Sequence, residues 1–217
     1  MKRFYFLLLC FVSLNAVNGQ EIDNDLLLIK KRMDSIKSYE AQIKLDIDIS
    51  FINMPSKYGK VRYRQGEPTK VTSRDFIMLP KRGLDLTLNE LFEHPFITVN
   101  RGEEDYKGVS CKVINLIPTS SKSQFSTATI FMDTSAKRIV KSEISTKMEG
   151  VFTTSLNYKN TIDVLPTAIE VEFAVNNVKI PLRFLGKETQ VDRKAIKQEG
   201  SKSGKIFLTL SDVQIGR

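Results

Sequence analysis

Alternation of apolar and polar residues recurs along this chain and constrains the fold more than any other feature of the sequence. Apolar residues fill every second position from Ile43 to Phe51, with lysine, aspartate and serine between them. Because successive side chains of a strand point to opposite faces, this stretch is expected to be a strand with one apolar and one hydrated face. Residues 60–64 and 168–175 repeat the pattern.

Glycine, proline and asparagine divide the rest of the chain into further strands of similar length. Residues 187–204 are polar and are expected to form a long solvent-facing hairpin loop. About ten strands at this spacing predict a meandering antiparallel sheet that is closed or strongly curved. The remaining strands are expected over residues 69–79, 96–100, 109–117, 125–132, 138–148, 151–158 and 206–210.

Two short helices are expected beside these strands. Apolar residues recur at spacings of three and four over residues 22–36, so they share one helical face. Asp23 or Asn24 would cap this helix, because a short side-chain oxygen accepts bonds from free backbone N–H groups. A second helix is expected over residues 88–93, where a threonine and a glutamate have capping-box spacing and a proline follows.

The first residues have the order of parts that characterises a secretory signal peptide. Lys2 and Arg3 precede an uncharged apolar run over residues 4–12, and small residues end the segment. This run is well short of the ~20 apolar residues that span a bilayer. Residues 1–19 are therefore expected to be a signal peptide, with Gln20 the first residue after cleavage. A periplasmic location is expected, with secretion as the alternative.

Residues 20–217 suit one domain that is large enough to bury a core without a metal or a disulfide. Cys10 would leave with the signal peptide, so Cys111 has no internal partner and is expected to be a small apolar residue in a buried strand. The expected fold class is mainly β (α+β): a single curved antiparallel sheet that forms an incomplete β-barrel, with about two short helices as a lid. A monomer is expected.

The chain is basic, with a formal net charge of +8. Such a charge attracts nucleic acid or anionic lipid through its field alone. The lysines are scattered over strands and turns without a dense tract, and export argues against nucleic acid. We therefore expect a solvated basic surface and no nucleic-acid partner.

Residue types that carry catalysis or bind metals are scarce. His94 is the one histidine, and it lies in a loop beside a proline, without the local partners of a catalytic triad. One histidine and Cys111 cannot fill a zinc site. The acidic residues 103–105 are expected to form a turn with solvated charges rather than a calcium site. Asp46 and Asp48 share a hydrated strand face, unlike the paired carboxylates of a glycosidase cleft. No enzyme activity, metal or cofactor is expected.

A sheet of this size has more apolar surface than two short helices can cover. Such a surface is either covered by helices or encloses a cavity. The sequence therefore favours an apolar cavity or groove.

Short motifs in a fixed order cover most of the chain after the signal peptide. They occupy residues 38–41, 59–63, 68–71, 103–113, 116–118, 130–133, 138–143 and 165–173. In their order and spacing the chain resembles the LolA-like superfamily of periplasmic lipoprotein carriers. It looks most like the outer membrane lipoprotein-sorting protein branch, which is related to the RseB-type sensor domain.

The resemblance implies an incomplete curved barrel with helices in its mouth and an apolar cavity that holds acyl chains, without a cofactor. The chain departs from the well-known carriers at two points. Their strand after the proline turn has an arginine tied to lid movement, where Lys70 stands nearest here and lacks the guanidinium fork. Their tryptophan signatures are also absent, because the chain has no tryptophan.

The function that follows is that of an exported, non-enzymatic carrier for the acyl chains of a lipoprotein or a lipid. The alternative is a periplasmic sensor of the RseB type that recognises lipid or an envelope protein. An inner- or outer-membrane protein partner fits both. Lys70 is the candidate for interaction with the lid. The candidate lining residues come from the apolar strand faces: Ile47, Ile49, Val61, Tyr63, Phe131, Phe152, Ile169, Val171 and Phe173.

Overall fold

A computed structural model describes residues 22–74, 89–176, 188–192, 194 and 201–216 of the chain. The signal peptide predicted for residues 1–19 lies outside the described residues, so that prediction stays a prediction.

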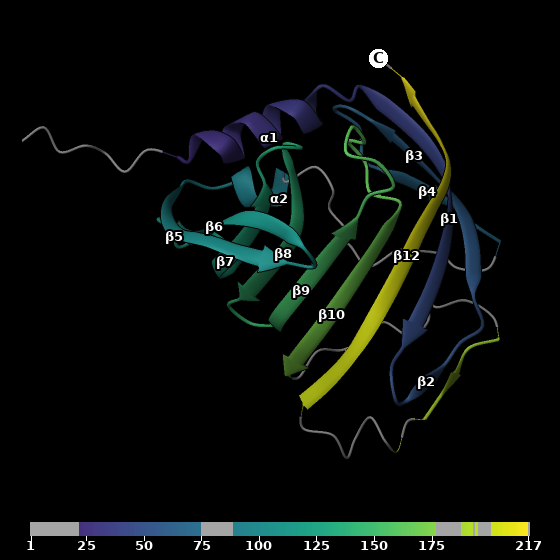
Figure 1. The fold of residues 1–217 in the computed structure, drawn as a ribbon. Coiled ribbons are helices and arrows are strands. Elements are labelled where there is room, and N and C mark those ends of the chain that lie inside the picture. The colour runs from purple at the N-terminus through teal and green to yellow at the C-terminus, as the bar shows by residue number, and fades with distance from the viewer. Residues whose placement is uncertain (1–21, 75–88, 177–187, 193, 195–200, 217) are drawn as a thin grey trace, which may run out of the picture.

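Ten strands form one antiparallel sheet that curves without closing on itself (Figure 1). The expected mainly β fold with an incomplete barrel is therefore confirmed. From one edge to the other the strands are β4 (Lys70–Thr72), β3 (Lys57–Arg64), β1 (Ser38–Asp48), β12 (Ser201–Gly216), β10 (Ala168–Asn176), β9 (Gly150–Asn157), β8 (Arg138–Thr146), β7 (Phe125–Asp133), β6 (Val109–Pro118) and β5 (Phe96–Tyr106). A separate pair joins β2 (Ile52–Asn53) to β11 (Gln190–Val191).

The order of the strands combines a local meander with one long-range pairing. Strands β5 to β10 follow one another in the sheet as they do in the chain. Strand β12 then lies between β10 and β1, so the first and last strands of the described chain meet inside the sheet. In this register Leu45 lies opposite Leu208 and Ile43 opposite Leu210. The alternation in both strands thus directs their apolar side chains to the same face.

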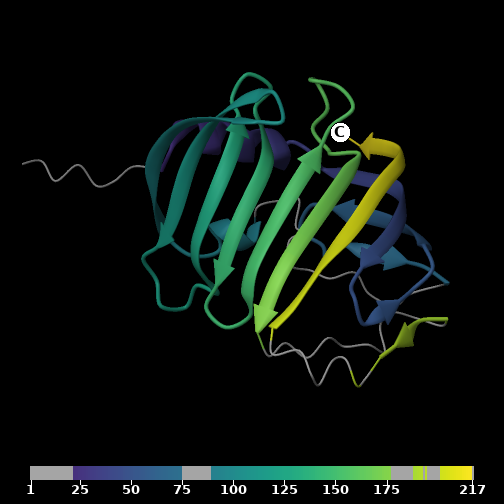
Figure 2. The same cartoon turned by 60° about the horizontal axis from the view of Figure 1, so that its bottom comes forward.

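The first helix, α1 (Asn24–Asp34), begins where the sequence predicts. The Asp23 carboxylate accepts bonds from the backbone N–H groups of Asp25 at 3.0 Å and Leu26 at 3.3 Å, so Asp23 is the cap. Its buried side chains, Leu26 and Ile29, face the sheet. The second helix, α2 (Asn89–Phe92), is a single turn within the range expected for it. Figure 2 shows α1 behind the curved sheet, on its concave side.

Two apolar clusters fill the concave side of the sheet. The first cluster lies on β1, β3, β10 and β12, and the second lies on β6, β7 and β8 beneath α1 and α2. The buried members of the first cluster are Ile36, Tyr39, Ala41, Ile43, Leu45, Ile49, Phe51, Ile52, Val61, Leu165, Ile169, Val171, Phe173, Ile206, Leu208 and Leu210.

The acidic residues 103–105 lie in a strand, so the turn expected for them is wrong. Strand β5 continues to Tyr106, and the turn follows at Lys107 and Gly108. A register shift between Asn100 and Gly102, where Gly102 has a φ of 96°, lets the strand continue past its irregularity. Because β5 is an edge strand, its charged side chains stay in solvent, as was expected of them.

Other boundaries also differ from the expected ones, and three of them change which residues belong to the sheet. Phe51 lies beyond the end of β1, in a turn where Ile49 bridges to Ile52. Strand β12 begins at Ser201, so residues 201–204 are part of the sheet and not of a loop. Pairing with residues 173–176 of β10 stabilises this polar start of β12, and pairing with β1 begins at Lys205. In the return strand expected over residues 69–79, β4 covers Lys70–Thr72, and residues 75–79 lie outside the described residues.

Candidate binding face

The concave face of the sheet carries continuous rows of apolar side chains across four strands. Ile47 of β1 lies opposite Ile206 of β12, which lies opposite Val171 of β10, which lies opposite Thr154 of β9. Cross-strand neighbours on one face are about 5 Å apart, so each row is in side-chain contact. The next row is Leu45, Leu208, Ile169 and Leu156. We call these rows, with the rest of the first cluster, the concave wall.

Eight of the nine candidate lining residues belong to the concave wall. Ile49, Val61, Ile169, Val171 and Phe173 are buried in the first cluster. Ile47, Tyr63 and Phe152 are partly buried and pack against it. The alternation of β1, β3 and β10 thus brings together side chains that are far apart in the sequence.

Phe131 lies on the opposite face of the sheet and does not meet the other eight. It packs in an outer cluster with Cys111, Val113 and Val140. Strand β7 is apolar on both faces, since Phe131 is flanked by Ile130 and Met132, which point to the concave side. Three consecutive apolar residues give no alternation, so the sequence cannot show which of them faces inward.

Lys70 also points away from the concave wall. It lies opposite Arg62, and its ammonium group is 3.3 Å from the carboxylate of Glu67 in the preceding turn. The next residue, Val71, packs against the first cluster, so Lys70 faces the outer side. The contact with a lid expected for Lys70 stays a prediction.

The sequence reasoning missed the wall residues that β12 supplies. Ile206 and Leu208 are central to the two rows, and both are buried. Their alternation with Leu210 indicates a strand with one apolar face, but the polar residues before them look like a loop and hide the full length of the strand. Tyr39 was also missed, and it stacks on Tyr63 with ring centroids 5.2 Å apart.

The two described helices cover only one part of the concave side. Leu26 and Ile29 of α1 and Leu91 of α2 pack in the second cluster. The first cluster contains no side chain of either helix. Within the described chain, the concave wall is therefore the apolar sheet surface that the helices leave uncovered.

Two titratable groups of the described residues on the outer side, Asp46 and Cys111, have shifted pKa values. Burial favours the neutral form of the Asp46 carboxyl, but hydrogen bonds from Ser56 and Lys44 outweigh it and lower the pKa. Burial, with smaller contributions from Asp133 and Asp105, raises the pKa of the Cys111 thiol, so the thiolate is disfavoured. No group of histidine, cysteine, aspartate and glutamate side chains among the described residues could hold a metal ion. None of the described helices is long and apolar enough to cross a membrane.

The fold and the wall define a class: an open antiparallel barrel with one apolar concave face. No family model and no curated protein matches the chain. Among solved structures, a DUF1329 family protein from Desulfovibrio piger matches with a TM-score of 0.54 and 12% identity, over 88% of this chain and 91% of that one. This likeness shows a shared fold.

Two other solved structures carry the name of the superfamily that the sequence resembles. They are a putative outer membrane lipoprotein-sorting protein domain from Vibrio parahaemolyticus and a LolA superfamily protein from Nitrosomonas europaea. Each has a TM-score of 0.47 and 13% identity over 88% of this chain, and the matches cover 91% and 94% of those chains.

Proposed function

We propose that this protein is an exported, non-enzymatic carrier whose concave wall holds the acyl chains of a lipoprotein or a lipid. The observation that carries the proposal is the wall itself, in which apolar rows such as Ile47, Ile206 and Val171 continue across strands. The row of Leu45 ends at Lys57 of β3, whose side chain is 3% exposed. A flexible hydrocarbon chain fits such a surface because apolar burial needs no directional bonds.

Burial of methylene groups supplies enough free energy for binding. Each methylene removed from water contributes about 0.8 kcal/mol, so about twelve of them contribute roughly 10 kcal/mol before the cost of immobilising the chain. The wall residues are themselves buried, with Val171 and Ile169 each 1% exposed. An acyl chain therefore reaches them only by displacing atoms that now contact them.

Binding suits the described residues better than catalysis does. The Cys111 thiol is buried and its pKa is raised, and Asp46 is held by Lys44 and Ser56 on the outer side. Neither group lies in the concave wall, where a bound acyl chain would be.

The test is native mass spectrometry of the protein purified from the periplasm, together with extraction of bound lipid. The parent protein is expected to carry a lipid or an acylated peptide. Val171→Gln places an amide in the wall and is expected to abolish this cargo. Val140→Gln is the matched control, because Val140 is also buried, at 6% exposure, but lies in the outer cluster.

A parent protein without cargo that also takes up neither phospholipid nor lipopeptide would overturn the proposal. Equal loss of cargo in both variants would mean that the effect is general destabilisation and not a change in the wall. An empty parent protein that binds an envelope protein would instead favour the sensor function.

A further inference from the structure

Three segments of the chain meet at one end of the sheet, around the side chain of Arg32 in the last turn of α1. Its guanidinium group donates to the backbone oxygens of Ala136 and Lys137 in the turn between β7 and β8, the latter at 3.1 Å. It also donates to the oxygens of Ile162 at 2.7 Å and Asp163 at 3.4 Å, in the loop between β9 and β10. These bonds hold the turn and the loop against the helix (Figure 1).

Large aliphatic side chains point into solvent from this end. Leu27 and Leu28, on the side of α1 away from the sheet, are 41% and 46% exposed. Ile162, in the loop that Arg32 holds, is 80% exposed. These three side chains lie on adjoining segments, and exposed apolar side chains near one another are a feature of interaction sites.

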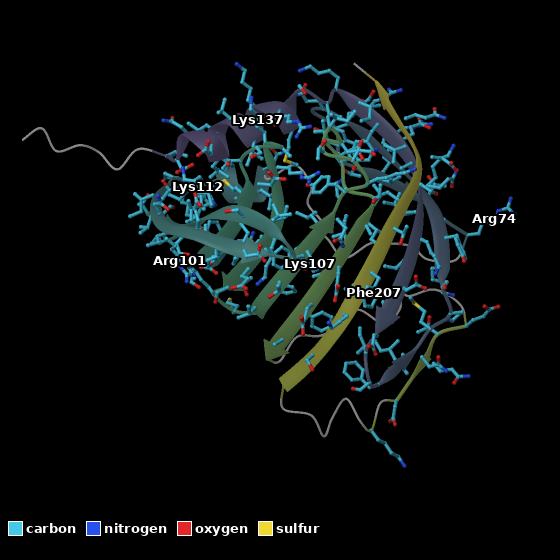
Figure 3. All side chains as sticks on the ribbon, viewed as in Figure 1. Arg74, Arg101, Lys107, Lys112, Lys137 and Phe207 are labelled. Carbon is cyan, nitrogen blue, oxygen red and sulfur yellow. The ribbon has the colours of Figure 1, made fainter. Side chains whose placement is uncertain are left out.

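The charged groups among these side chains are mainly cationic. Lys31, Lys137 and Lys159 are exposed on the helix, the turn and the loop, and Figure 3 shows Lys137 beside α1. The neighbouring acids are already engaged. Asp34 pairs with Lys30 at 2.5 Å, and Asp25 pairs with Lys112 at 2.6 Å. The Asp163 carboxylate accepts bonds from the backbone and side chain of Asn160.

We propose that this end, which we call the α1 end (Leu27, Leu28, Ile162, Lys31, Lys137 and Lys159), docks the protein on an anionic lipid bilayer. Aliphatic side chains that insert among head groups, with lysines around them, are the combination that binds such a surface. The cationic groups match the negative potential of anionic lipid, which fixes the occupant as a membrane rather than a neutral apolar partner.

This inference deepens the proposed function, since docking on a bilayer would bring a carrier of acyl chains to the lipid that it loads or releases. The role of docking rests on the proposed function, but docking itself does not require bound cargo and is measured separately.

The test is co-sedimentation of the exported form of the protein with vesicles. One set of vesicles contains phosphatidylcholine alone, and the other contains equal parts of phosphatidylcholine and phosphatidylglycerol. The parent protein is expected to sediment with the anionic vesicles, and less so as salt screens the charges. Replacement of Lys31, Lys137 and Lys159 by glutamine is expected to weaken binding about fivefold for each lysine removed.

Matched controls lie at the opposite end of the same strands. Met148, in the turn between β8 and β9, is 89% exposed, and Lys122 is exposed in the adjoining loop between β6 and β7. Ile162→Asp is expected to weaken binding to anionic vesicles, whereas Met148→Asp and Lys122→Gln are expected to leave it unchanged.

Failure of the parent protein to bind either vesicle, or equal losses from changes at the two ends, overturns the docking proposal. Native mass spectrometry of the same preparations keeps the two proposals apart. Ile162→Asp is expected to retain its cargo while losing vesicle binding. Loss of both together with a loss of unfolding cooperativity would assign Ile162 a structural role and overturn its role in docking.

Discussion

The start of α1 is held by one carboxylate that has two roles, and this makes Asp23 a sharp test of how the helix is fixed to the sheet. One oxygen of Asp23 caps α1 by accepting from two backbone N–H groups. The other lies 2.8 Å from the ammonium group of Lys112 on β6, which also pairs with Asp25. Asp23→Ala removes the cap and the ion pair together.

The cost follows from the sum of these two contributions. Loss of an N-cap side chain costs about 1 kcal/mol. The ion pair is partly buried, with the Asp23 and Lys112 side chains 13% and 24% exposed, and Lys112 keeps its second partner. After allowance for solvent screening, the pair contributes about 0.5–1 kcal/mol. Asp23→Ala is therefore expected to lower the free energy of unfolding by about 1.5–2 kcal/mol.

Urea unfolding followed by circular dichroism measures this cost, and Asp23→Asn separates its two parts. Asparagine keeps the capping oxygen without the charge, so only the cost of the ion pair, about 0.5–1 kcal/mol, is expected. Equal effects of alanine and asparagine, or no effect of alanine, would refute a cap that stabilises the helix. The hydrogen bonds that the Lys112 ammonium group donates to the Asp23 and Asp25 carboxylates raise the pKa of Lys112 above its ordinary 10.5. This contribution is thus complete below pH 10.5 and is lost as the pH rises through the raised pKa.

Three further outcomes are expected. Ile169 is 1% exposed in the concave wall, and Ile169→Ala should lower the free energy of unfolding by about 2–5 kcal/mol in a urea titration. Ile117 is 41% exposed, so Ile117→Ala should change this free energy by less than about 0.5 kcal/mol in the same titration. The Cys111 thiol should resist Ellman's reagent at neutral pH and react fully in urea, because burial raises its pKa in the folded protein; rapid reaction without urea would contradict this burial. Tyr158→Phe removes the hydroxyl that donates to the Ile139 oxygen at 2.9 Å and should cost about 1–3 kcal/mol; a neutral effect on urea unfolding would show that this oxygen finds another donor.

The parts of the fold that could be predicted are those where one face of a helix or strand is apolar and the other is hydrated. Residues 43–48 alternate without an exception, and they form the strand expected of them. The capping site at Asp23 could be predicted for a similar reason, because it depends on a side chain and backbone groups that are neighbours in the chain.

Features set by distant contacts could not be predicted in the same way. The polar residues 201–204 look like a loop, but pairing with residues 173–176 of β10 keeps them in the sheet. Phe131 has apolar neighbours on both sides, so its face depends on the outer cluster that Tyr106 helps to cover from the end of β5. Tyr106 is far from Phe131 in the sequence, as β10 is from residues 201–204, so local patterns do not reveal these contacts.

The candidate site shows the same difference between features set by local patterns and features set by distant contacts. Alternation correctly grouped eight side chains on one face, because each strand needed only its own pattern and a partner in register. It could not show that Lys70 turns to the outer side, since β4 is only three residues long and its direction depends on pairing with Arg62 of β3.

The position of β12 between β10 and β1 determines when the molecule can become complete. Ser38 of β1 pairs with Gly216 of β12, so this part of the wall cannot form until β12 has been synthesised. Strands β5 to β10 can assemble from contacts between neighbours, whereas closing the loop from β1 to β12 has a large entropic cost and is slow. A sheet built in this way stays incomplete until β12 arrives, and the candidate binding face is its last part to form.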